Sequence, residues 1–212
     1  SSSNSAADEP GVSYAKVPYF SLPGSIAKSA IAPSCLACFD YTNGLADIVV
    51  GYMGAPLKTN GLMSESLQTV TVRNERGEAM LRTAIDSGRI VVEGTVDGKG
   101  SHEQISLATV QSDNIVMAIT GGDIKEAGMP KLLGEIMATI IRGVGPKGIN
   151  FARYSIDYHV LRNYLYVLNE WGEERVQTSL PDYAMTIVDK YMANESFAEL
   201  RRKVLAKRQM ND

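Results

Sequence analysis

The sequence predicts an α/β protein of the α+β kind, in which a small mixed sheet with flanking helices is followed by a helical C-terminal region. Two observations carry this prediction. In the first half, short runs rich in Val and Thr alternate with turns that contain glycine, asparagine or proline. In the second half, apolar residues recur every three or four positions over long stretches, as on one face of a helix.

The first half holds the predicted strands. Residues 68–73 (QTVTVR) alternate between apolar and polar types and predict one strand, and 89–96 (RIVVEGTV) predict a second. Residues 45–54 run apolar into glycine, a pattern that fits either a buried strand or the end of a short helix. Ser101 is the N-cap candidate of the second helix in this half. The helices expected here span residues 78–86 and 101–111.

The second half is expected to be helical throughout. Residues 129–144 are strongly apolar at helical spacing, and the sequence GPKG then separates them from a long helix at 149–172. Two shorter helices are expected at 179–193 and 195–208, and the basic end of the last one suits the helix dipole. One face of the long helix carries Phe151, Tyr154, Tyr158, Leu161 and Leu165.

Composition narrows the class of protein. The chain has 212 residues, 44% hydrophobic residues and a formal net charge of -3, so no nucleic-acid partner and no anionic membrane surface is expected. No apolar run approaches the ~20 residues of a membrane-spanning helix, and the first residues do not resemble a secretory signal. Two cysteines are too few for a disulfide scaffold, which favours a reducing compartment. Residues 1–15 are predicted to be disordered.

Residues 34–47 (SCLACFDYTNGLAD) hold both cysteines of the chain, Cys35 and Cys38, in a Cys-x-x-Cys. Four interpretations are open from the spacing: two buried free cysteines, a zinc site, a redox dithiol, or part of an iron–sulfur cluster. A zinc knuckle or a cluster needs more ligands than two thiolates. His102 and His159 lie at no diagnostic spacing, so both are interpreted as ordinary helix-surface or core histidines.

Three segments carry a family resemblance: APSCLACFDYTNGLADIVVGYMGAP, TVRNERGEAML and VGPKGINFARYSIDYHVLRNYLYV. They resemble the beta-subunit family of deazaflavin-reducing hydrogenases and dehydrogenases, and the third resembles its chlorophyll-reducing branch. Known members bind FAD and 4Fe-4S clusters and are about twice as long. The resemblance implies that residues 16–195 form a C-terminal domain of this type, followed by a terminal basic helix at 196–212.

The resemblance also implies site residues. Cys35 and Cys38 occupy positions of cluster ligands, and the 4Fe-4S cluster would be completed by cysteines outside this chain. Beside the flavin it places Asp40, Tyr41, Thr42, Asn43, Arg73, Asn74 and Gly77. His159 is the candidate proton donor, because its free pKa lies near neutrality. Other polar members of the long helix that could line a pocket or an interface are Arg153, Asp157, Arg162 and Asn163.

The activity implied is that of a ferredoxin-dependent reductase that converts 7-hydroxymethyl chlorophyll a to chlorophyll a. The alternatives are reduction of the 8-vinyl group of divinyl chlorophyllide, reduction of another electron carrier, and a non-catalytic role as a structural subunit of a larger chloroplast complex. The partners expected are reduced ferredoxin, the pigment and the N-terminal half of the reductase, with a homo-oligomer left open. The location expected is the chloroplast stroma or thylakoid surface, or the cytoplasm of a cyanobacterium.

Two further expectations concern surfaces. An apolar patch made of Pro33, Leu36, Phe39 and Tyr41 is expected to surround the cysteines and to meet the other half of the reductase. The apolar helix at 129–144 is expected to need cover from the same half.

Overall fold

The computed structural model of the protein describes residues 17–55, 66–96, 101–122, 127–144 and 148–211. The α+β class is confirmed, with one small sheet and a helical C-terminal region. The predicted disordered segment 1–15 lies outside the described residues. The elements are η1 (Tyr19–Ser21), α1 (Gly24–Ser29), α2 (Pro33–Leu36), β1 (Ile48–Gly51), β2 (Thr69–Val72), α3 (Glu75–Asp86), α4 (Glu103–Ser112), α5 (Asn114–Ile119), α6 (Lys131–Val144), α7 (Ile149–Ser179), α8 (Asp182–Met192) and α9 (Glu195–Asn211).

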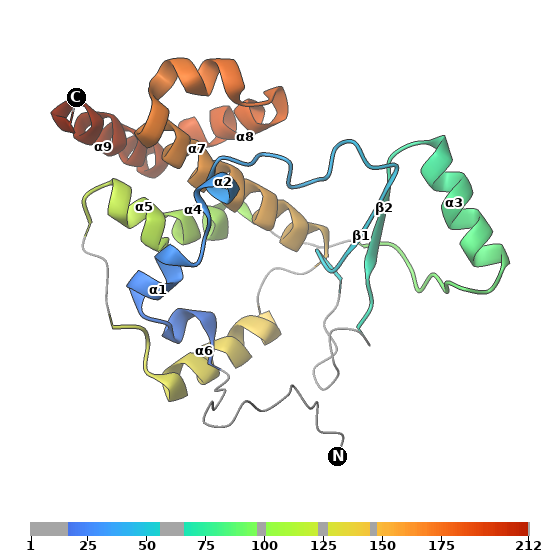
Figure 1. Ribbon diagram of the computed structural model, residues 1–212. Helices are drawn as coiled ribbons and strands as arrows, with labels where there is room; N and C mark the ends of the chain where they lie inside the picture. Colours follow the sequence, from blue (N-terminus) through green and yellow to red (C-terminus); the bar gives the residue numbers. More distant parts are fainter. Residues whose placement is uncertain (1–16, 56–65, 97–100, 123–126, 145–147, 212) are drawn as a thin grey trace, which may run out of the picture.

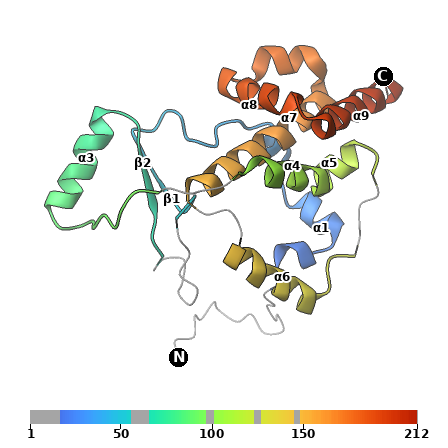
Figure 2. The ribbon, with the colours of Figure 1, turned by 180° about the vertical axis from the view of Figure 1, so that it is seen from behind.

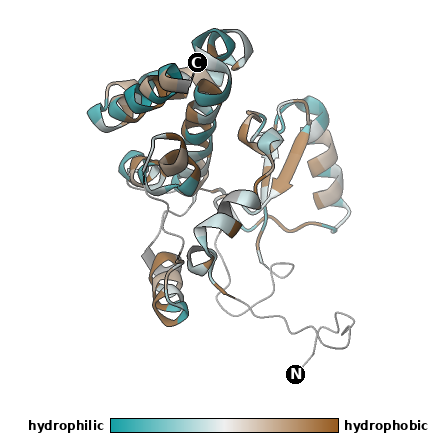
Figure 3. Cartoon of the chain, turned by 60° about the vertical axis from the view of Figure 1, so that its left-hand side comes forward, coloured by the Kyte–Doolittle hydropathy of each residue, from teal (hydrophilic) through white to brown (hydrophobic). Residues whose placement is uncertain are grey.

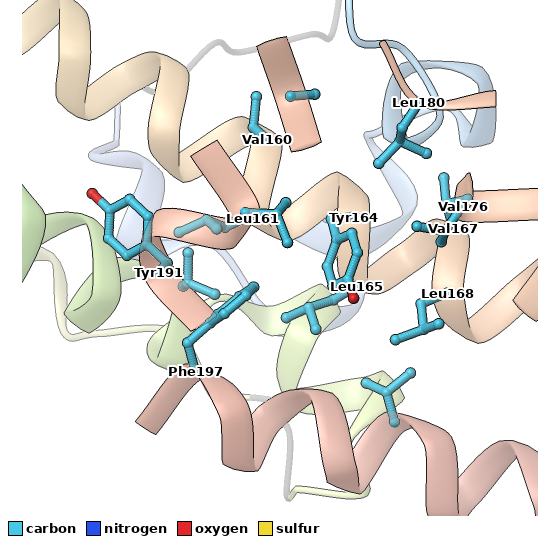
Figure 4. Packing of buried hydrophobic residues seen from close by; sticks show 14 of the residues in the cluster. Val160, Leu161, Tyr164, Leu165, Val167, Leu168, Val176, Leu180, Tyr191 and Phe197 are labelled. Carbon is cyan, nitrogen blue, oxygen red and sulfur yellow. The ribbon is translucent and has the colours of Figure 1, made fainter. Parts of the chain in front are cut away.

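Helices α4, α5, α7, α8 and α9 pack together around one core, and we call them the helical bundle. Helix α7 supplies the centre of this core, and every residue from Val160 to Leu165 is buried. The helix is therefore covered on all sides here, whereas the sequence predicts one apolar face, and Phe151 of that face is 39% exposed. The packing is close: Leu161 and Leu165 of α7, Val188 of α8 and Phe197 of α9 are buried. Figure 4 shows this packing, with the side chains of α7 meeting those of the last two helices.

The sheet described consists of β1 and β2, which pair antiparallel with Ile48 opposite Val72 and Gly51 opposite Thr69. Helix α3 follows β2 directly. Asn74 is its N-cap, because the side-chain oxygen accepts a hydrogen bond from Gly77 N at 3.0 Å. Glycine is required at position 77, since a Cβ there would lie 2.2 Å from the Asp47 carbonyl oxygen.

The strands, α3 and residues 89–96 lie to one side of the helical bundle, and we call residues 48–55 and 66–96 the strand lobe. Figures 1 and 2 show this lobe apart from the bundle, joined to α2 by the loop of residues 37–47. The strand that faces the viewer in Figure 3 is brown, which marks hydrophobic residues. Several of these side chains are nevertheless exposed, as in Val50, which is 56% exposed.

Two sequence predictions in this half are wrong. Residues 89–96 form no strand, because a strand needs a partner for its backbone hydrogen bonds and no other described segment pairs with it. Its side chains stay in solvent, with Val91 79% exposed. Ser101 is not the N-cap of α4. The cap position is His102, and the Ser101 hydroxyl instead donates to the Glu103 carboxylate at 2.7 Å.

Helix α7 is two helices in sequence. Gly172 has φ 81° and ψ -179°, which breaks the helix at the end predicted for it. The carbonyl of Asn169, one turn earlier, accepts a hydrogen bond from Arg208 Nη1 of α9 at 2.7 Å. An added Cβ at position 172 would lie 3.3 Å from the Arg208 guanidinium. The glycine therefore both ends the helix and makes room for its distant cap.

Helix α6 keeps an apolar face in solvent. The side chains of Leu132, Ile136 and Ile140 are 73%, 49% and 50% exposed. In the parts of the chain that the structure describes, no helix combines the length and the apolar character needed to cross a membrane. The expectation that α6 needs cover from outside this chain stays a prediction.

Candidate functional site

Cys35 lies in α2, a single helical turn, and Cys38 follows two residues after its end; we call residues 33–38 the cysteine turn. Pro33 stands at the start of α2, where its missing N–H costs nothing, and Cys35 N donates to the Ala32 carbonyl at 2.9 Å. Leu36, between the cysteines, is only 5% exposed, whereas Cys35 and Cys38 are both exposed and free. The turn therefore buries its apolar residue and keeps both thiols at the surface.

Asn163 of α7 holds this turn from inside. Its side chain is fully buried, and its Nδ2 donates to the Cys35 and Cys38 carbonyls, each at 2.9 Å. The Tyr41 hydroxyl lies against the same nitrogen. A side-chain amide has two N–H donors, so the two carbonyls and the Tyr41 hydroxyl share them. One side chain thus fixes the backbone of both cysteines.

A chain of hydrogen bonds runs on from Asn163 toward α5. Arg162 Nε donates to Asn163 Oδ1 at 3.2 Å, and Arg162 Nη1 donates to the Tyr158 hydroxyl at 3.3 Å. The Tyr158 hydroxyl donates to Asp113 Oδ2 at 2.5 Å. Burial raises the pKa of Tyr158, with a further contribution from the Asp113 carboxylate. Asp113 in turn caps α5 through two backbone N–H groups.

Tyr41 and His159 pack together beside the turn, with ring centroids 5.1 Å apart. Burial raises the pKa of Tyr41 to about 12, so its phenol keeps its proton at neutral pH. Tyr183 of α8 lies beside the same loop, where partial burial and the Asp40 carboxylate raise its pKa. The sequence did not indicate Tyr183, because α8 follows the loop by more than a hundred residues.

The geometry of His159 bears on its predicted role as a proton donor. Burial lowers its pKa, and Nδ1 lies 2.6 Å from the Ser155 carbonyl oxygen. A carbonyl only accepts hydrogen bonds, so the proton of the neutral ring sits on Nδ1 and Nε2 is left as an acceptor. In that state His159 is suited to accept a proton, and its role as a donor stays a prediction.

Arg73 is brought to the loop after the cysteines. Its guanidinium donates to the Thr42 carbonyl. The loop also organises itself: Gly44 N donates to Asp40 Oδ1 at 2.7 Å, and Asn43 adopts a positive φ of 48°. Asp40 and Asn43 are both short polar residues that tolerate such turns. The structure therefore gathers Arg73 and the residues 40–43 in one place.

Asn74 and Gly77 have structural roles on the strand lobe. Asn74 Nδ2 donates to Asp47 Oδ1 at 2.5 Å while its Oδ1 caps α3, and Arg76 adds an ion pair with Asp47 at 2.8 Å. These bonds to Asn74 and Arg76 lower the pKa of Asp47. Whether Asn74 and Gly77 also contact a cofactor stays a prediction.

A second polar cluster lies inside the bundle, away from the cysteines. The carboxylate of Asp157 accepts from His102 Nε2 at 2.9 Å and from the Tyr191 hydroxyl at 2.6 Å, and all three residues are buried. His102 is therefore a satisfied core histidine, as the sequence interpretation has it. The signal for this cluster in the sequence was a polar residue, such as Asp157, within a largely apolar helix, because a buried polar group needs a hydrogen-bond partner.

The predicted apolar patch around the cysteines is wrong. Leu36 and Phe39 are buried, and Phe39 joins the core of the helical bundle with Tyr41 packed against it. Only Pro33 of the four is exposed. The bundle of this same chain covers Phe39 and Tyr41, so these two residues serve its own core.

With this geometry in place, comparison with known proteins identifies the family. Residues 9–98 match the family model that describes the C terminus of the beta subunit in coenzyme F420 hydrogenase/dehydrogenase. This part of the chain belongs to that family. The chain is 43% identical over 83% of its length to the protein named 7-hydroxymethyl chlorophyll a reductase, chloroplastic, of Oryza sativa subsp. japonica. It is also 36% identical over 85% of its length to an uncharacterized protein of Nostoc sp..

These matches cover 36% and 40% of the two relatives, so the chain spans well under half the length of the curated relatives. Within the described residues, no group of three or more His, Cys, Asp or Glu side chains could hold a metal ion. The family resemblance implies a cluster and a flavin, and two exposed thiols on one turn fit half of a four-thiolate cluster.

Of the residues predicted to contact the flavin, Arg73 suits a phosphate better than the start of α3 does. A guanidinium has five N–H donors, so Arg73 can bond Thr42 and also meet a phosphate. The first turn of α3 carries Glu75 and Glu78, with Asp47 beside it. This negative charge opposes a phosphate at that helix terminus. Arg73 is thus the better of the two predicted anion contacts.

Proposed function

We propose that this chain is the C-terminal part of a reductase that converts 7-hydroxymethyl chlorophyll a to chlorophyll a. The observation that carries the proposal is the surface Cys-x-x-Cys turn, whose backbone Asn163 anchors to α7 while both thiols stay exposed. The 43% identity to the rice reductase extends over 83% of the chain and supports the same substrate class.

The reaction removes a hydroxyl group from the pigment. Two electrons and two protons convert the hydroxymethyl group to a methyl group and release one water. A 4Fe-4S cluster and FAD would together carry electrons from reduced ferredoxin to the pigment. Cys35 and Cys38 would supply two cluster thiolates, and cysteines of the remaining part of the reductase would supply the others.

The loop of residues 40–43 and Arg73 would lie next to the flavin. In this arrangement the guanidinium of Arg73 offers positive charge to an anionic cofactor group. Tyr41 stays a neutral phenol, because burial raises its pKa to about 12. His159, with its lowered pKa, is neutral and available to accept a proton beside Tyr41.

The rice relative carries the name chloroplastic, and we propose the chloroplast for this protein too. Reduced ferredoxin is the proposed electron donor and the N-terminal part of the reductase the proposed partner. Reduction of the divinyl substrate is the second candidate, since the same cofactors could reduce a vinyl group to an ethyl group.

The test uses the protein assembled with its N-terminal part, loaded with iron, sulfide and FAD under anaerobic conditions. Reduced ferredoxin and 7-hydroxymethyl chlorophyll a are added, and pigments are separated by chromatography. We expect chlorophyll a to form. Conversion of a divinyl substrate alone would move the function to vinyl reduction, and a loaded protein that converts neither pigment would refute the proposal.

A matched variant distinguishes a structural subunit from an enzyme. Cys35→Ser should lower the iron content per chain and abolish pigment reduction, because one thiolate is lost. Ser34→Ala, at the exposed neighbouring position, is the control and should retain both. Unchanged iron in Cys35→Ser would show that this cysteine is not a ligand.

A further inference from the structure

We infer that Asn163 is a positioning residue for the Cys35 and Cys38 thiols: its buried amide holds both cysteine carbonyls inward, so that both thiols face outward as one ligand pair. This inference rests on the proposed role of the two cysteines as metal ligands. It adds a residue 128 positions away from Cys35 in the sequence and outside the cysteine motif.

The backbone of the cysteine turn points its carbonyls inward. Both carbonyls point to a nitrogen that is fully buried, with N–O distances of 2.9 Å. Of the residues between them, Leu36 is buried and Ala37 packs against the bundle core. Both cysteines are exposed. The two carbonyls, Leu36 and Ala37 are thus held inward, while the two cysteine residues stay exposed.

Arg162 fixes the orientation of the Asn163 side-chain amide. Asn163 Oδ1 accepts from Arg162 Nε, which is a donor under any ionisation that the protein meets. This fixes the oxygen toward Arg162 and the NH₂ toward the carbonyls. Arg162 is itself only 6% exposed and is held over the Tyr158 ring, with its guanidinium carbon 5.3 Å from the ring centroid. The orientation of the donor group is therefore built into the bundle.

A positioning role and a folding role for Asn163 predict different effects on metal binding. Groups that orient metal ligands by hydrogen bonds typically change metal affinity by about 10–100-fold when they are removed. A cap that served only folding would change the stability of the chain and leave the affinity of the folded protein alone. The two roles therefore differ in a measurable quantity.

Asn163→Asp is the sharpest variant, because it keeps the shape of the side chain and replaces the NH₂ donor by an oxygen. That oxygen would face two carbonyl oxygens and repel them. Asn169→Asp is the matched control. Asn169 lies on the same helix, and its side chain bonds the adjacent Glu170 at 2.8 Å and not the cysteine turn.

The probe is Cd²⁺ alone, titrated anaerobically into the 212-residue chain. The thiolate-to-cadmium absorbance in the ultraviolet reports binding by the cysteines, and chelator competition gives the dissociation constant. Circular dichroism is recorded on each sample to show that the helices are intact. The double variant Cys35→Ser, Cys38→Ser defines the signal that does not come from the thiols.

We expect folded Asn163→Asp to bind Cd²⁺ about 10–100-fold more weakly than the unaltered chain, and Asn169→Asp to bind as the unaltered chain does. Equal affinity in folded Asn163→Asp overturns the inference. If Asn163→Asp loses its helices, Arg162→Lys serves instead, because it removes the Nε–H that orients the amide; unweakened binding by folded Arg162→Lys then overturns it. No cysteine-dependent signal in the unaltered chain would instead refute the ligand role of the cysteines themselves.

Discussion

The helical bundle and the strand lobe differ in how many of their side chains are buried. In the bundle, Leu161, Leu165 and Phe197 are completely buried, and the core continues through five helices. In the described residues of the strand lobe, the only buried positions are the glycines Gly54 and Gly77. A two-stranded sheet is marginally stable on its own in water. The comparison teaches that the bundle is stabilised by its own buried core, whereas the strand lobe has little buried side-chain surface and is held by the loop of residues 37–47 and by the close approach of Gly54 to Gly148.

The largest expected effect is in the bundle core. Leu165→Ala removes a fully buried side chain and should lower the free energy of unfolding by about 2–5 kcal/mol. Val91→Ala in the strand lobe should change it by at most about 0.5 kcal/mol, since Val91 is 79% exposed. Denaturant unfolding followed by circular dichroism measures both. Similar losses in the two variants would break the comparison.

The next effect is local to the strand lobe. Gly77→Ala places a Cβ 2.2 Å from the Asp47 carbonyl and should open the contact between α3 and the loop, at a cost of about 1–3 kcal/mol. Hydrogen exchange should accelerate in β1, β2 and α3 and stay unchanged in α7. Gly51→Ala is the control, because an added Cβ there meets no atom within 4 Å. Faster exchange in α7 as well would show that the two regions unfold together.

A smaller effect is the pH dependence of the stability that His159 causes. His159 packs against Tyr41, in the loop that joins the two regions. Burial holds the pKa of His159 below its unfolded value of about 6.5. Between these two pKa values the unfolded chain binds the proton that the folded chain resists, so the stability falls as the pH drops from about 7.5 through this window. His159→Gln should lose less stability between pH 7.5 and pH 5.5 than the unaltered chain. Identical losses in thermal unfolding would exclude His159 as the cause.

The smallest effect on stability is expected at α6, a helix whose apolar face is exposed like the strand lobe. Replacing Ile136 and Ile140 by Gln should change the unfolding free energy by at most about 0.5 kcal/mol for each residue. Binding of an apolar dye and self-association should both decrease, because a contiguous apolar surface becomes polar. A large loss of helix content would mean that this face is packed, and α6 would then belong with the bundle.

Periodicity predicted most of the fold because it is a local property. The helix at 149–172, its end at Gly172 and the strand around Val70 all follow from residues close in sequence. The absence of a strand at 89–96 did not, because the pattern shows that a segment suits a sheet but not whether a partner strand is present. Helix α5 was not predicted, since its six residues are too few to show a period.

The candidate site was predictable only in its chemistry. The spacing of Cys35 and Cys38 marked a thiol pair. The family resemblance placed the following loop and Arg73 beside one flavin, which stays a prediction, and the structure brings Arg73 to the Thr42 carbonyl. The burial of Leu36 could not be read from the motif, because α2 packs against α7, more than a hundred residues later. The same separation hid the contact between Asn163 and the cysteine carbonyls.

The contact between Gly172 and Arg208 predicts which residues these two positions tolerate. Arg208 closes the open end of the helix that carries the candidate site, and it does so through the space that the missing side chain of Gly172 leaves. Neither substitution is neutral alone: a side chain at 172 meets the guanidinium and must adopt φ 81°, whereas a shorter residue at 208 leaves the Asn169 carbonyl without this donor. The backbone strain at position 172 persists whatever residue stands at 208, 36 residues later. A library randomised at both positions should therefore keep glycine at 172 and favour long hydrogen-bond donors at 208.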